Sequence, residues 1–174
     1  MKKLTFETFY PDPPERVWQA LTDAKALSLW LMPTTFKPLI GFRFRFDGLN
    51  RGKKSTVEGV VLESEAAKKL SYTWDDGEDD APGVVSWTLQ PKDGGTQLTL
   101  EHVPAEAPKP YVLIEASQNW NRALGASLPI VLRMLRLEAE LPKVPIVYVT
   151  EDTELQSTSK RRAGFRQEEV SCNS

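Results

Sequence analysis

The sequence predicts a single α+β domain in which a curved antiparallel sheet grips a long C-terminal helix around an apolar cavity. Two observations carry this prediction. Apolar side chains recur at every second position in several segments between residues 4 and 102, which is typical of half-buried strands. The repeat then lengthens to about 3.6 residues, which is typical of a helix buried on one side. The helical stripe comprises Trp120, Leu124, Leu128, Val131, Leu132 and Leu135.

The N-terminal part predicts one strand followed by two short helices. Residues 4–8 alternate apolar with polar side chains. In residues 11–15, Asp12 is placed to cap a helix, and prolines fit its first turn without losing a needed N–H group. This helix and a second one from about Asp23 each have one apolar side, formed by Val17, Trp18 and Leu21 in the first and by Leu27, Trp30 and Leu31 in the second.

The middle of the chain predicts the rest of the sheet. From Gly41 the period is two, with Phe42, Phe44 and Phe46 on one face and Arg43 and Arg45 on the other. Strand-like segments follow at residues 56–62, 70–74, 85–89 and 98–102, and glycine-containing turns or acidic loops separate them.

The long helix after the proline-bearing segment 103–110 contains Pro129, which removes one backbone hydrogen bond. We therefore expect a kink or break near residues 125–128. The domain is expected to span residues 1–139. Residues 140–174 are expected to be a partly flexible extension, whose one apolar stretch is residues 144–149.

Composition excludes several classes of function. Lys and Arg number 22 against 24 Asp and Glu, so no basic field is available to attract nucleic acid. The single cysteine, Cys172, allows no intramolecular disulfide and no cysteine-based zinc site. No run of about eighteen apolar residues predicts a membrane span, and no signal peptide is recognised. We expect a cytoplasmic protein without a cofactor or metal.

Two motifs that resemble ligand loops do not meet the requirements of their classes. Residues 48–55 (GLNRGKKS) have three residues between the glycines, where a phosphate loop has four, and a hairpin turn explains them better. The acidic residues 75–80 lack the alternating spacing of a calcium loop, and a solvated turn explains them better. We assign catalysis to neither segment.

His102 is the only histidine, which excludes sites built on several histidine ligands. By strand parity it shares the face of Leu98 and Leu100, at one end of the predicted cavity. A hydrogen-bonded histidine at a sheet margin is the favoured interpretation, and a general base in the cavity is the alternative.

Five tryptophans occupy inward positions of the predicted strands and helices. Bulky rings pack poorly without irregular space, so the aromatic side chains predict either a ligand cavity or a filled core, and the sequence does not decide between them. The residues predicted to border the cavity are Trp18, Phe44, Trp74, Trp87, His102, Trp120 and Leu124.

Residues 13–23 (PPERVWQALTD), with Leu29 and Trp30 after them, resemble the opening motif of the branch named for activators of a heat-shock-protein ATPase, in the START-like or SRPBCC superfamily. Residues 41–44, 70–74 and 95–100 agree with this resemblance, which covers about residues 4–137. It implies the helix-grip fold and a small hydrophobic ligand, lipid-like or polycyclic, between the sheet and the last helix. Pro129 and the extension depart from the usual pattern.

Three functions remain open on this basis. The first is binding of a small hydrophobic molecule without chemistry of the protein's own. The second is a protein-interaction or co-chaperone-like role of the surface, as for the namesake of the branch, and the third is an enzyme that uses His102. A homodimer through an open sheet edge or the extension is a further hypothesis.

Overall fold

The computed structural model describes residues 3–50, 53–77, 81–104, 106 and 108–137 of the 174-residue chain. All of them belong to one unit, residues 1–141. The predicted extension and its apolar stretch at residues 144–149 lie outside the described residues.

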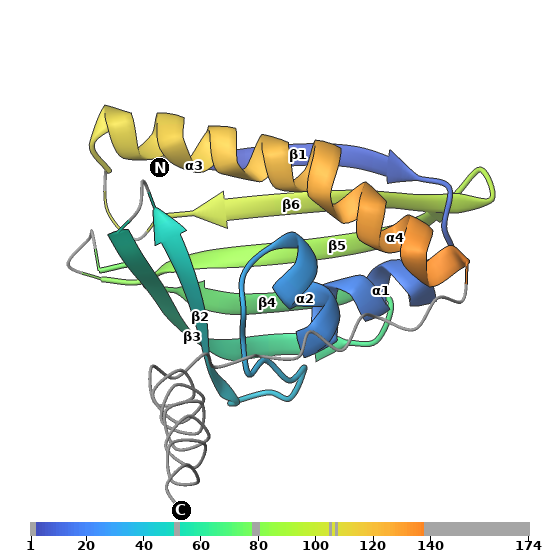
Figure 1. The fold of residues 1–174 in the computed structure, drawn as a ribbon, viewed down its shortest axis with the longest axis horizontal. Helices are drawn as coiled ribbons and strands as arrows, with labels where there is room; N and C mark the ends of the chain where they lie inside the picture. Colours follow the sequence, from blue (N-terminus) through green and yellow to red (C-terminus); the bar gives the residue numbers. More distant parts are fainter. Residues whose placement is uncertain (1–2, 51–52, 78–80, 105, 107, 138–174) are drawn as a thin grey trace, which may run out of the picture. The chain divides into compact units, whose positions relative to one another are not determined.

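Six antiparallel strands form one sheet in the order β1-β6-β5-β4-β3-β2 (Figure 1). Their bounds are β1 (Leu4–Tyr10), β2 (Arg43–Asn50), β3 (Lys53–Glu65), β4 (Lys69–Trp74), β5 (Gly83–Lys92) and β6 (Gly95–Val103). Neighbours in sequence are neighbours in the sheet, except that β1 pairs with β6, where Leu4 stands opposite His102. The predicted strands are all present, and β3 extends beyond residues 56–62 in both directions.

The alternation predicted for β2 places its phenylalanines in the core. Phe44 and Phe46 are buried, whereas Arg43 and Arg45 are exposed on the other face. Phe44 stands opposite Gly59 of β3, and a methyl group at Gly59 would collide with the Phe44 ring and the Thr73 carbonyl oxygen. The lack of a side chain at Gly59 therefore leaves the space that the Phe44 ring occupies.

Two short helices, α1 (Pro14–Thr22) and α2 (Ala24–Trp30), follow β1 as the sequence predicts. The cap of α1 differs from the prediction: Pro13 is the N-cap residue, and no side chain caps this helix. Asp23 caps α2, with its carboxylate accepting a hydrogen bond from the Ala26 N–H group at 2.9 Å.

Asp12, which the sequence assigned to capping, is instead a buried ion-pair partner. Its carboxylate accepts from Arg136 Nε and Nη2 at 3.1 and 2.8 Å and from Arg16 Nη1 at 3.2 Å. Burial by itself would raise the pKa of Asp12, but the hydrogen bonds and charges of Arg136 and Arg16 outweigh it and lower the pKa. The prediction was wrong because Arg136, 124 residues away, competes for the same oxygens.

The C-terminal helix runs without a break from residue 110 to residue 136, but it bends and is irregular in its hydrogen bonds (Figure 1). It consists of α3 (Pro110–Arg122), a π-helical segment η1 (Ala123–Ser127) and α4 (Leu128–Arg136). In η1 the Leu128 N–H group donates to the Ala123 carbonyl. The next carbonyl, that of Leu124, would require the N–H group that Pro129 lacks. The predicted irregularity at residues 125–128 is therefore a π-bulge.

The Tyr10 hydroxyl group supplies the hydrogen bond that Pro129 cannot. It donates to the Leu124 carbonyl oxygen at 2.7 Å in a buried position. Burial raises the pKa of Tyr10, so that the hydroxyl group stays protonated over the ordinary pH range.

The helices lie over one face of the sheet (Figure 1), and they cover it unequally. The helix α4 buries Leu128, Val131 and Leu132 against the core. Along the thirteen residues of α3, Trp120 is the one side chain that is buried. The α4 half of the helix thus contributes more buried side chains than the α3 half.

Candidate functional site

An open groove of about 1130 Å³ lies between α3 and the β2–β3 hairpin. The end of α2 with the following loop (residues 30–33) forms its third wall, and the sheet contributes residues of β4 and β6. The groove is located where α3 lacks buried contacts. The part of the sheet face beside α3 is therefore accessible from outside.

Aromatic side chains form the inner part of the groove. Trp74 from β4 and Trp120 from α3 have their ring centroids 5.4 Å apart with planes inclined at 56°. The His102 ring lies 5.9 Å from Trp74, and Trp30 of α2 lines the groove farther along. Such indole surfaces bind flat apolar groups by stacking and by burial of apolar area.

A hydrogen bond connects the helix to the sheet inside this aromatic set. The Trp120 Nε1–H group donates to His102 Nδ1 at 3.2 Å. Because an indole N–H group can only donate, His102 Nδ1 must carry its lone pair here, and a neutral ring then has its hydrogen on Nε2. For Nε2 to act as a base, the ring hydrogen would have to move to Nδ1, and the bond from Trp120 would be lost.

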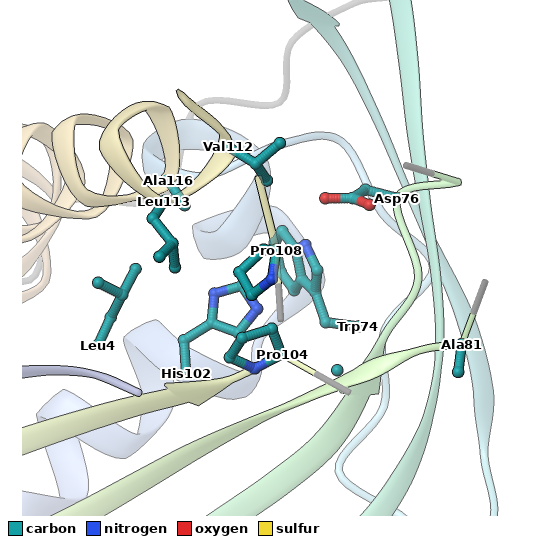
Figure 2. A pocket seen from close by; sticks show the side chains of 11 residues that line it. Leu4, Trp74, Asp76, Ala81, His102, Pro104, Pro108, Val112, Leu113 and Ala116 are labelled. Carbon is teal, nitrogen blue, oxygen red and sulfur yellow. The ribbon is translucent and has the colours of Figure 1, made fainter. Parts of the chain in front are cut away.

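A smaller hollow of about 30 Å³ opens beside His102, large enough for a water molecule. Figure 2 shows the His102 and Trp74 rings beneath Pro108, with Val112, Leu113 and Ala116 of α3 above them. The Asp76 carboxylate reaches this space from the opposite side. The polar groups at this end are an imidazole and one carboxylate.

The rim of the groove on the hairpin side is charged and nearly balanced. Arg45 Nε and Asp47 Oδ1 form an ion pair at 2.7 Å, with both side chains 56% exposed. Across the groove, α3 contributes Glu115, Gln118, Asn119 and Arg122. The groove is therefore amphiphilic, with tryptophan rings in its inner part and a polar rim.

The structure brings three of the seven predicted cavity residues together at the groove: Trp74, His102 and Trp120. The other four, Trp18, Phe44, Trp87 and Leu124, do not line it. Phe44 lies under Phe36, with centroids 5.0 Å apart, and Trp87 is enclosed by Trp30 and Trp120. Leu124 is buried in the core, and Trp18 packs against that core from α1.

Several lining residues were not predicted. Met32 and Pro33 lie in the loop after α2, where no sequence pattern marks them as facing a groove. Val112, Ala116 and Trp120 lie four residues apart on α3, and this helical spacing could have extended the predicted stripe toward the N-terminus of the helix. Arg45 and Asp47 lie on the face of β2 opposite to the buried Phe44 and Phe46. They still line the groove, because β2 is the edge strand of the sheet.

Among the described residues, no group of three or more His, Cys, Asp or Glu side chains could hold a metal ion. No helix in that same part of the chain has the length and apolarity needed to cross a bilayer. Residues 48–50 and 53–55 of the rejected phosphate motif belong to the two strands of the β2–β3 hairpin, as a hairpin interpretation requires.

Sheet, helix order and groove together define the helix-grip fold of the START-like superfamily. Residues 12–133 match the family described as activator of Hsp90 ATPase homolog 1-like protein. No curated protein matches the chain.

Solved structures agree with this assignment. A protein from Mesorhizobium loti is 31% identical over 76% of this chain and 97% of its own, with a TM-score of 0.67. A protein from Chromobacterium violaceum is 22% identical over 75% of this chain and 96% of its own (TM-score 0.64), and CalU16 from Micromonospora echinospora is 23% identical over 78% and 80% (TM-score 0.63). The latter two support the fold alone. The chain belongs to the family of activator of Hsp90 ATPase homolog 1-like proteins.

Proposed function

We propose that the protein binds a small amphiphilic molecule, with a flat or branched apolar body and a polar edge, in the groove between α3 and the β2–β3 hairpin. The observation that carries this proposal is the half-buried Trp74 ring, packed against the buried Trp120 ring beneath a charged rim, in a groove of about 1130 Å³. Ligand sites commonly have about 300–1,000 Å³ and a few placed polar groups among apolar ones.

Burial of the apolar body supplies the affinity in this proposal, at about 25 cal/mol per Å² before the costs of ordering. The polar rim orients the ligand, because Arg45, Asp47 and Arg122 are at the edge of the groove and remain hydrated. The proposed role is binding, and the bond that His102 Nδ1 accepts from Trp120 does not favour use of that nitrogen as a base.

The test uses native mass spectrometry and quenching of tryptophan fluorescence with a panel of lipids, polycyclic aromatics and sterol-like molecules. In the variant Ala116→Trp, a ring is added on α3 at a position that lines both the groove and the hollow, and it is expected to abolish binding. Ala126→Trp, at an exposed position of η1 outside the groove, is the matched control and should bind as the wild type does.

The proposal fails if no member of the panel binds, or if both tryptophan variants bind equally well. A normal unfolding transition of Ala116→Trp ensures that loss of binding is not loss of the fold.

A surface function like that of the family's namesake is the second candidate, and one observation favours it. Leu39 and Ile40 are 59% and 71% exposed on a loop that lies along β3, where Leu62 is 46% exposed. Grouped apolar side chains of this kind mark protein contacts. A change in the rate of an Hsp90-type ATPase that Ile40→Ser abolishes would support this role, and an unchanged rate at saturating protein would reject it.

A further inference from the structure

A hydrogen bond from the Trp120 indole N–H group to His102 Nδ1 connects α3 to the sheet inside the groove, and we call this bond the latch. On α3, which forms the groove wall, Trp120 is the one buried side chain among residues 110–122. The ring of Trp120 also contacts Trp74 and Trp87, at centroid distances of 5.4 and 5.6 Å. The position of α3 over the groove therefore depends strongly on this one side chain.

The two ends of the C-terminal helix are held differently. On the α4 side, the Tyr10 hydroxyl group donates to the Leu124 carbonyl oxygen in a buried position, and the exposed Arg136 side chain donates to the buried Asp12 carboxylate. On the α3 side, the residue before the helix is Lys109 and no side chain caps its first turn. The π-bulge at residues 123–127 lies between the two halves. The α4 half is thus held by the bonds of Tyr10 and Asp12, and the α3 half by that of Trp120.

Protonation of His102 is incompatible with the latch. The Trp120 indole needs an acceptor, and an imidazolium ring has an N–H group at both nitrogens. At 3.2 Å two donors would face each other across the bond. Histidine is the side chain whose charge ordinarily changes between about pH 5 and 8, and this bond requires the neutral form of the ring.

Charged groups around His102 come from several elements. Asp76 of the β4–β5 loop lines the hollow beside the ring, and Glu115 of α3 lines the same groove. Glu101, the next residue toward the start of β6, pairs with Lys3 at the start of the chain. β5 presents Val85 opposite His102, and β1 presents Leu4.

We propose that His102 is a pH-responsive latch of the binding groove. When neutral, it holds Trp120 and keeps α3 against the sheet. When protonated, it releases Trp120, so that α3 loosens and the groove exchanges its contents faster. This inference deepens the proposed binding function, on which its second readout rests, by assigning a regulation to the same site.

The first readout needs no ligand. In ¹⁵N NMR spectra, the Trp120 indole resonance is assigned by its loss in Trp120→Phe and followed from about pH 7.5 to about pH 5.5. It is expected to shift with the same midpoint as the His102 ring. The Trp30 indole, which donates to the Ala20 carbonyl oxygen at 2.8 Å, is the internal control and should stay constant. A constant Trp120 resonance while His102 titrates would overturn the latch.

The second readout is release of the probe 8-anilinonaphthalene-1-sulfonate, measured by stopped-flow fluorescence at both pH values. Wild type is expected to release it about two- to tenfold faster at the lower pH, the effect of one net hydrogen bond. His102→Asn supplies an acceptor that does not titrate and should remove the step. Trp120→Phe should release the probe fast at both pH values, because it retains a ring but lacks the donor.

The two readouts separate the two proposals. If the Trp120 resonance shifts as expected and neither the probe nor any member of the ligand panel binds, the latch stands and the binding function fails. If His102→Asn retains the full pH step in probe release, other groups cause it, and the latch is refuted as the regulator of the groove.

Discussion

Replacing Tyr10 by Phe removes one oxygen atom and tests the account of the bent helix. The Tyr10 hydroxyl group donates to the Leu124 carbonyl oxygen at 2.7 Å, and both residues are 4% exposed. In Tyr10→Phe this carbonyl keeps no donor, since the Leu128 N–H group is engaged with Ala123 and Pro129 has none. An unsatisfied buried acceptor costs about 1–3 kcal/mol of unfolding free energy.

The mechanism is isolated by a double-mutant cycle with Pro129→Ala. Alanine at residue 129 restores an N–H group within reach of the bulge, so Tyr10→Phe should cost less in that background by about 0.5–3 kcal/mol. Tyr111→Phe, which removes a hydroxyl group from a side chain that is 56% exposed, is the matched control and should change stability by less than about 0.5 kcal/mol.

Denaturation in urea, followed by circular dichroism, gives the free energies of the four proteins. Equal costs of Tyr10→Phe with and without Pro129 would show that the hydroxyl group does not compensate for the proline. A cost near zero in the wild-type background would refute the reasoning altogether.

Three further outcomes follow from the fold. The lowered pKa of Asp12 contributes stability that is present at neutral pH and lost as the pH falls below about 4. The variant Asp12→Asn should therefore be less stable than the wild type at pH 7, and its stability should change less as the pH is lowered. Urea midpoints measured between about pH 2.5 and 7 test both expectations. Gly59→Ala should cost about 1–3 kcal/mol or prevent folding, because its methyl group meets the Thr73 carbonyl oxygen; thermal unfolding measures this, and a neutral effect would contradict the packing. Gly125→Ala, where no atom lies within 4 Å of the added methyl group, should instead stabilise by about 0.4–1 kcal/mol in the same assay, and a loss of stability there would be unexpected.

Local patterns were sufficient to predict the order of elements. The alternation through Phe44 and Phe46 determines which face of β2 is buried, and the prolines before α1 mark its first turn. Pro129 indicated an irregular helix, because loss of an N–H group is a local property of the chain. The form of the irregularity depends on Tyr10, which is 114 residues from Leu124, and no local pattern contains that information.

The candidate site was harder to predict for a related reason. Strand parity places a side chain on the covered face but does not say what covers it. Trp74 and Trp87 both face inward; Trp74 reaches the groove, whereas Trp30 of α2 packs edge-on against Trp87 at 6.1 Å. Whether an inward ring lines a groove or belongs to the core is decided by the docking of α2 and α4, which is a tertiary property.

The pairing of β1 with β6 also sets an order of assembly. Leu4 meets His102, so the first strand made on the ribosome waits for nearly a hundred residues before its partner exists. Closing so long a loop is entropically costly, and domains rich in such distant pairings fold slowly. During synthesis Phe6 and Phe9 of β1 remain without a partner strand until residue 103 has been made, and over that interval the unpaired strand is open to association with other chains.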